Sequence, residues 1–179
     1  MSFDQFVKDR ILDVLAMDST GMRMNASGIF VFEDVKHRFA KGHIGGKEVN
    51  LEFISETIQS AGGMYSTAND MLKYLSANMG LIQTKIKDAI QETHLIRHTF
   101  GQSSDNEVLK DYTGLWWTVT TDYGKEVIWH MGSIDGYTSI IGFNSGKQIG
   151  LAILCGCDHS DFSPREMINI VIPFLLYYK

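Results

Sequence analysis

The last third of the chain alternates apolar runs with short, glycine-containing turns, and this pattern restricts the possible folds more than any other feature. Runs rich in β-branched and aromatic residues that end in tight turns are typical of antiparallel hairpins. The runs cover residues 115–120, 126–130, 137–143 and 148–154, and the turns cover residues 122–125, 131–136 and 144–147. We therefore expect an antiparallel meander, with its near-continuously apolar last strand covered on both faces.

Helices are expected before and after this meander. Apolar side chains recur at helical spacing over residues 3–16, 67–80 and 82–93. Thr67 is a candidate N-cap because an acidic residue follows three positions later, and Gly80 is a candidate stop signal. A last helix is expected from Ser163, where Pro164 occupies the first helical position and Glu166 completes a capping box.

Composition excludes several classes of function. The net charge is −5, and no basic run is longer than a residue or two, which argues against nucleic acid as a partner. No apolar run approaches the roughly 18 residues of a membrane span. Charges near Met1 interrupt any signal-peptide pattern, so the sequence leaves the compartment unknown. With 179 residues, 44% of them hydrophobic, and no linker, we expect one domain over residues 1–179.

Cysteine and histidine pairs suggest metal sites by residue type alone. Cys155, Cys157 and His159 could ligate a metal, but structural metal sites usually space their ligands more widely. We expect the cysteines to pack as small apolar side chains without a disulfide, since strand spacing rarely suits one. His94 and His98 stand four residues apart without the carboxylate of a metalloprotease motif, so a solvated helix face is expected. No metal and no cofactor are predicted.

Several fragments resemble segments of one protein family, in the order that the family has them. They lie at residues 11–17, 40–43, 61–71, 114–117 and 130–137. Residues 61–71 read AGGMYSTANDM, which resembles the AGGLxSTAxDM segment of β-lactamase-like serine hydrolases. Residues 114–117 read GLWW and are similar to the GLGW strand of that family. Residues 130–133 read HMGS and resemble its third motif, written Lys-Thr-Gly or His-x-Gly.

This resemblance implies a fold and exposes a departure from the family. The family includes penicillin-binding proteins, D-alanyl carboxypeptidases, esterases and ampC-type β-lactamases. It implies an α+β sandwich, β-lactamase/transpeptidase-like, in which helices flank an antiparallel sheet. The family's nucleophile lies in Ser-x-x-Lys and its base in Tyr-x-Asn, and this sequence contains neither pattern. The chain therefore resembles the C-terminal portion of such a hydrolase, lacking the N-terminal part and its first two strands.

The same resemblance nominates site residues. It makes His130 and Gly132 part of the catalytic wall, with the backbone N–H of Ser133 as one of two oxyanion donors. The alternative for His130 is an edge-strand histidine bonded to a backbone carbonyl. The implied substrate-binding residues are Tyr65, Met131 and Tyr137. Trp116 and Trp117 could also line a cleft, although core packing is the better expectation for at least one of them.

Three functions remain open at this point. The first is the C-terminal portion of a serine hydrolase that acts on an ester, amide or peptide and is inactive alone. The second is a degenerate, non-catalytic member used for binding or assembly. The third is a metal hydrolase built on Cys157, His159 and Asp161. A small-molecule or peptide substrate is expected once the N-terminal part is supplied, and an open sheet edge predicts self-association.

Overall fold

The central element is a six-stranded antiparallel sheet. The computed structural model describes residues 1–22, 36–49, 59–99 and 110–178. The strands run in the order β10-β9-β8-β7-β6-β5. Their bounds are β5 His98–Thr99, β6 Lys110–Thr113, β7 Thr118–Asp122, β8 Lys125–Ile134, β9 Tyr137–Asn144 and β10 Ile149–Cys155. The predicted meander is confirmed as β7 to β10.

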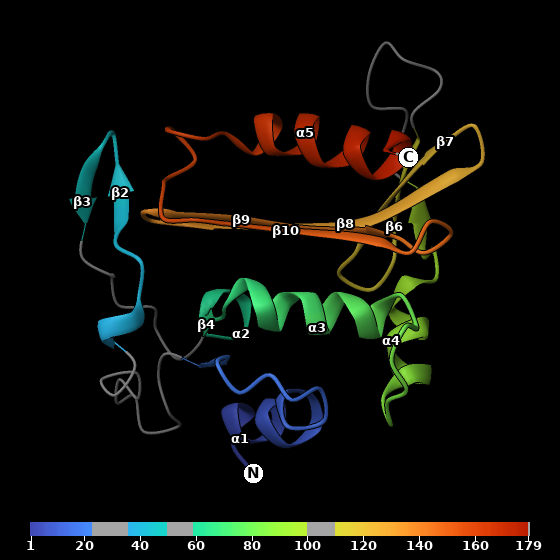
Figure 1. The fold of residues 1–179 in the computed structure, drawn as a ribbon, viewed down its shortest axis with the longest axis horizontal. Helices are drawn as coiled ribbons and strands as arrows, with labels where there is room; N and C mark the ends of the chain where they lie inside the picture. The colour runs from blue at the N-terminus through green and yellow to red at the C-terminus, as the bar shows by residue number, and fades with distance from the viewer. Residues whose placement is uncertain (23–35, 50–58, 100–109, 179) are drawn as a thin grey trace.

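Helices cover both faces of this sheet, which confirms the predicted fold class. Figure 1 shows the sheet edge-on, with α5 (Pro164–Tyr177) along one face and α3 (Ala68–Asn78) along the other. Val127, Trp129 and Ile140 pack with the buried residues of α5. Leu75 of α3 packs with a second cluster that includes Ile128 and Phe143. Alternate residues of each strand thus supply two separate cores.

Local signals set the ends of the two flanking helices as predicted. The Thr67 hydroxyl accepts a hydrogen bond from the Asp70 N–H (3.3 Å) at the start of α3. Gly80 takes a positive φ of 73° just beyond the end of that helix, where glycine is favoured. Ser163 and Glu166 form the complete capping box of α5, and the helix continues through Pro173 to its end at Tyr177.

The N-terminal half matches the sequence predictions less closely. The expected helix over residues 3–16 becomes α1 (Phe3–Val7) followed by a π-helix, η1 (Lys8–Leu12). Phe3 and Phe6 are exposed, while Val7 and Leu12 pack against Ala77 and Ile90. Helix α4 spans only Lys87–His94. The remaining elements are β1 (Gly21–Met22), η2 (Lys36–Arg38), β2 (Gly42–Ile44), β3 (Lys47–Val49), α2 (Gln59–Gly62) and β4 (Met64–Tyr65).

The cysteine prediction is wrong. Cys155 and Cys157 form a disulfide, with their Cα atoms 5.2 Å apart. The prediction assumed that both residues lie in one extended strand, but β10 ends at Cys155 and the chain bends at Gly156. The bend brings the Cα atoms within the range that a disulfide needs. Within the described ranges, no helix is both long and apolar enough to cross a membrane.

Candidate active site

Among the residues that the structure describes, the end of strand β8 has a partner strand on one side only. Strand β9 pairs with residues 128–134 of β8, whereas β7 pairs with residues 125–129 and begins at Thr118, opposite Trp129. The sequence placed residues 131–136 in a turn, but β8 continues to Ile134 and the turn is confined to Asp135 and Gly136. Gly136 takes a positive φ of 78°, which suits this tight reversal. His130, Gly132 and Ser133 therefore lie on a strand.

Hairpin geometry fixes the direction of the Ser133 backbone N–H. In a two-residue hairpin the flanking residues, here Ile134 and Tyr137, form a hydrogen-bonded pair. Backbone groups alternate between the two edges of a strand, so those of Ser133 point away from β9. They point toward the side on which β7 has not yet begun. This N–H is thus directed at the unpaired edge of β8.

The predicted site residues of β8 lie on two different faces of the strand. Met131 packs against the cluster beneath α5, on the same face as Trp129. His130 and Gly132 lie on the opposite face, with Ile128, toward the helical lobe that contains α3. Of the described residues, a side chain at Gly132 would meet only Ser139, whose hydroxyl would lie 3.5 Å away, so these residues leave space above this glycine. The Met131 side chain, which the sequence had assigned to substrate binding, therefore lies on the opposite face of β8 from His130.

His130 is half-buried beneath an exposed tryptophan. Its imidazole stacks on the Trp116 ring, with the ring centroids 5.4 Å apart and the planes 24° apart. Burial lowers the pKa of His130 below its ordinary value of 6.5. This shift favours the neutral imidazole, which can donate one hydrogen bond and accept another.

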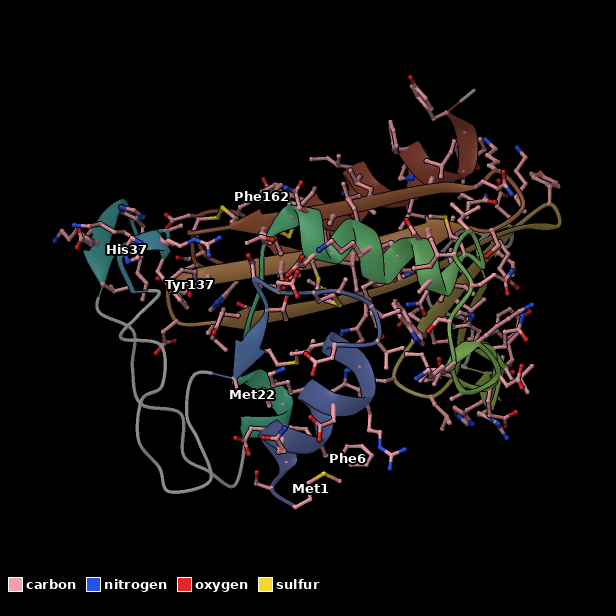
Figure 2. The ribbon with its side chains drawn as sticks, turned by 60° about the horizontal axis from the view of Figure 1, so that its bottom comes forward. Met1, Phe6, Met22, His37, Tyr137 and Phe162 are labelled. Atoms are coloured by element: carbon pink, nitrogen blue, oxygen red, sulfur yellow. A yellow bond between two sulfur atoms is a disulfide. The ribbon has the colours of Figure 1, made fainter. Side chains whose placement is uncertain are left out.

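The two predicted tyrosines hold the segment around β2. Tyr137 donates a hydrogen bond from its hydroxyl to the Ala40 carbonyl (2.8 Å), and its ring packs tightly over Gly42. Figure 2 shows Tyr137 at the end of the sheet nearest the β2–β3 hairpin. Tyr65, in β4, meets the Phe39 ring edge-on at 5.1 Å, and burial raises the pKa of its hydroxyl. Tyr137 therefore lies at the β8–β9 turn and holds Ala40, while Tyr65 contacts Phe39 of the same segment.

A family model described as Beta-lactamase matches residues 1–171. The chain belongs to the beta-lactamase family. No curated protein matches the sequence significantly.

Solved structures agree with this beta-lactamase family fold. A beta-lactamase/D-alanine carboxypeptidase from Pseudomonas syringae matches all of this chain and 54% of its own, with a TM-score of 0.78 and 17% identity. A class C beta-lactamase covers 98% of this chain and 51% of its own, with a TM-score of 0.73 and 19% identity. The match to D-alanine carboxypeptidase AmpC from Burkholderia cenocepacia covers 92% of this chain and 52% of that one, with a TM-score of 0.70 and 21% identity. The chain thus spans about half the length of these structures.

The side chains that the sequence suggested as metal ligands, Cys157, His159 and Asp161, do not converge in this beta-lactamase family chain. The disulfide occupies the sulfur atoms of Cys155 and Cys157. His159 Nδ1 lies 3.1 Å from Asp158 Oδ1, whereas Asp161 accepts a hydrogen bond from the Gly45 N–H. In the part of the chain that the structure describes, no three His, Cys, Asp or Glu side chains converge on a possible metal position.

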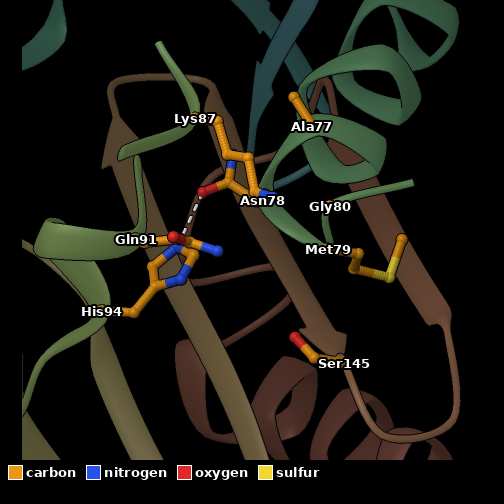
Figure 3. Close-up of a pocket in the computed structure, with 8 residues that line it drawn as sticks. All are labelled: Ala77, Asn78, Met79, Gly80, Lys87, Gln91, His94 and Ser145. Carbon is orange, nitrogen blue, oxygen red and sulfur yellow. Dashed lines mark hydrogen bonds between the residues drawn. The ribbon is translucent and has the colours of Figure 1, made fainter. Parts of the chain in front are cut away.

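A polar hollow that the sequence did not reveal lies at the opposite end of β9 from Tyr137. It has a volume of about 190 Å³ and is lined by Ala77, Asn78, Met79, Gly80, Lys87, Gln91, His94 and Ser145 (Figure 3). Asn78 donates to the Tyr74 carbonyl, so its Oδ1 accepts the hydrogen bond from His94 Nε2 (2.8 Å). His94 is therefore half-buried rather than solvated as expected, and burial lowers its pKa. Strand β9 separates this hollow from the Tyr137 end of the sheet by roughly 23 Å.

Proposed function

We propose that the chain is the C-terminal portion of a beta-lactamase family serine hydrolase that cleaves an ester, amide or peptide bond. Residues 1–179 would form part of one hydrolase domain, and the nucleophile would come from a Ser-x-x-Lys segment outside them. The observation that carries this proposal is the Ser133 N–H, directed at the unpaired edge of β8. The half-length match to the solved structures supports a divided site.

Each residue of the wall has a defined chemical task in this proposal. The nucleophilic serine attacks the substrate carbonyl, and the Ser133 N–H donates a hydrogen bond to the oxyanion that forms. Gly132 leaves room above β8 for the acyl group. The neutral His130 imidazole donates to the substrate or accepts a proton beside the reacting atoms. A base of the segment that carries the nucleophile takes the serine proton and passes it to the leaving group as the acyl-enzyme forms, and water then hydrolyses the acyl-enzyme.

Tyr137 and Tyr65 have a supporting task. Tyr137 fixes the segment at Ala40 to the β8–β9 corner, and Tyr65 packs against Phe39 in the same segment. We infer that the two rings define one end of the substrate cleft. Met131 contributes packing beneath α5 instead.

The test compares this chain with a longer protein. The coding DNA upstream of Met1 is read for Ser-x-x-Lys and Tyr-x-Asn, and the extended protein is expressed beside the 179-residue chain. Both are incubated with a fluorophosphonate and analysed by intact mass and peptide mapping. We expect one adduct per extended protein, on the upstream serine, and none on the short chain.

Two results would overturn the proposal. A stoichiometric adduct on the isolated chain would place the nucleophile within these residues. An extended protein that lacks Ser-x-x-Lys, or forms no adduct, would instead favour the non-catalytic member of the family that binds or assembles. An octameric penicillin-binding protein homologue from Pyrococcus abyssi, with a TM-score of 0.66 and 20% identity, shares this fold.

A further inference from the structure

Trp116 lies at the tip of the β6–β7 hairpin. Strands β6 and β7 pair up to Thr113 and Thr118, and the Gly114 N–H donates to the Trp117 carbonyl (2.9 Å) to close the loop. Leu115 and Trp116 are the two residues of that loop. Trp116 is 71% exposed, whereas the other two tryptophans are 5% and 9% exposed and belong to the two cores.

The backbone of Trp116 occupies a conformation that favours glycine. Its φ is +70°, and tight turns usually place glycine or asparagine at such a position. Residues 114–117 resemble a family segment that reads GLGW, which has glycine where this chain has Trp116. A large exposed ring at a strained turn position adds nothing to the core. Residues held in this way concentrate at functional sites.

The Trp116 ring extends the surface of the candidate wall. It stacks on His130, with ring centroids 5.4 Å apart, and the two rings form one aromatic surface. Gly132 is the next residue along that face of β8; it is exposed, and the described residues leave space above it. Leu115, half-exposed at the same hairpin tip, adds further apolar surface. A planar group on these rings would lie beside the edge at which the Ser133 N–H points.

We propose that Trp116 and His130 form a binding surface for a flat apolar group of the substrate, such as the aryl ring of an ester or amide. Trp116 is then a specificity-determining residue of the proposed hydrolase, and the inference rests on that proposed function. Stacked aromatic rings favour offset contact with a further ring, which selects aryl over small alkyl groups.

The test measures binding to the isolated chain, so it needs no nucleophile. The chain is titrated with 2-phenylacetamide, and with acetamide as the ring-free probe, while NMR follows the His130 imidazole and Trp116 indole resonances. Trp116→Gly removes the ring but keeps a residue suited to the turn. Tyr123→Gly is the matched control, because Tyr123 is also an exposed aromatic residue at positive φ (45°), at the tip of the β7–β8 hairpin.

We expect 2-phenylacetamide to shift both resonances saturably and acetamide to cause no saturable shift. Trp116→Gly should weaken the response of His130 by about threefold or more, the value of one aromatic contact, and Tyr123→Gly should leave it unchanged. The inference is overturned if neither resonance responds, if acetamide binds equally well, or if both variants behave alike. An extended protein that forms no acyl-enzyme would overturn the proposed function instead, and the binding result would stand.

Discussion

Two exposed aromatic residues in the hairpins before β8 have an unfavourable backbone conformation. Trp116 takes a backbone conformation that costs a non-glycine residue about 1–2 kcal/mol, and its ring stack on His130 returns about 0.5–1.5 kcal/mol. Tyr123 has a positive φ in the neighbouring hairpin and is even more exposed. Comparing substitutions at Trp116 and Tyr123 therefore separates the free-energy cost of the positive φ from the contribution of the Trp116–His130 stack.

Glycine at these two positions should have different effects on stability. Trp116→Gly relieves the backbone and loses the stack, so the free energy of unfolding should stay within about 1 kcal/mol of wild type. Tyr123→Gly should raise the free energy of unfolding by about 1 kcal/mol, because glycine relieves the strained backbone and the substitution loses less side-chain contact than Trp116→Gly does. Urea unfolding followed by circular dichroism measures both values. A loss above about 2 kcal/mol in Trp116→Gly would mean that the ring stabilises the fold.

The two half-buried histidines, His94 and His130, should make the fold sensitive to mild acid. Burial lowers the pKa of His94 and of His130 in the folded chain, while the unfolded chain takes up these protons near pH 6.5. Stability is therefore full above that pH and is lost as the pH falls through the folded pKa values.

His94→Gln should reduce this loss between pH 7 and pH 5, since glutamine can still donate to Asn78 but does not titrate. Urea unfolding at the two pH values gives the comparison, and the variant at pH 7 is its own reference. An equal or larger loss in the variant would show that His94 does not contribute to the acid sensitivity.

At the scale of elements, the β2–β3 hairpin is attached to the sheet through the segment that carries the disulfide. His43 donates from Nδ1 to the Gly156 carbonyl (3.0 Å), and the Asp158 N–H donates to the His43 carbonyl (2.8 Å). Gly156 packs so closely on Lys41 that a side chain there would clash. The Cys155–Cys157 bridge holds both ends of this three-residue segment.

Reducing the disulfide should loosen that attachment. A dithiol reductant converts the bridge to two thiols, and the freed segment no longer fixes the Gly156 carbonyl. We expect faster amide hydrogen exchange over residues 42–49, with α5 unchanged, and a mass increase of two alkyl groups after alkylation. The double variant Cys155→Ser/Cys157→Ser should exchange at the faster rate with or without reductant. Unchanged exchange in the fully alkylated protein would contradict the account.

How far the sequence predicts each element depends on how local its signals are. Strands β7 to β10 and helices α3 and α5 carry their own turns and caps, as the Thr67 cap and the Ser163 box illustrate. Strands of two or three residues, such as β1 and β4, are defined by their pairing and leave little trace in the sequence. The disulfide was missed because a bend at Gly156 follows the strand. The stack of Trp116 on His130 depends on two hairpins meeting, which no local pattern encodes.

At the scale of the whole molecule, two parts of the sheet matter for the proposed function: its outer strand β10 and the end of strand β8. Strand β10 is the last strand of the sheet as described, and the corner of β8 carries His130, Gly132 and the Ser133 N–H. The solved structures that share the fold are about twice as long. The central claim is that this wall supplies an oxyanion donor to a serine that lies elsewhere.

Two substitutions at Ser133 in the extended protein test that claim most directly. Ser133→Ala removes the hydroxyl and keeps the N–H. Ser133→Pro removes the N–H at a strand position whose N–H has no ladder partner among the described strands. The rate of acylation by a fluorophosphonate is measured for both variants and for wild type. Ser133→Ala should react at nearly the wild-type rate, and Ser133→Pro about 100-fold more slowly, with its circular dichroism spectrum unchanged. A folded Ser133→Pro variant that reacts as fast as Ser133→Ala would contradict the account.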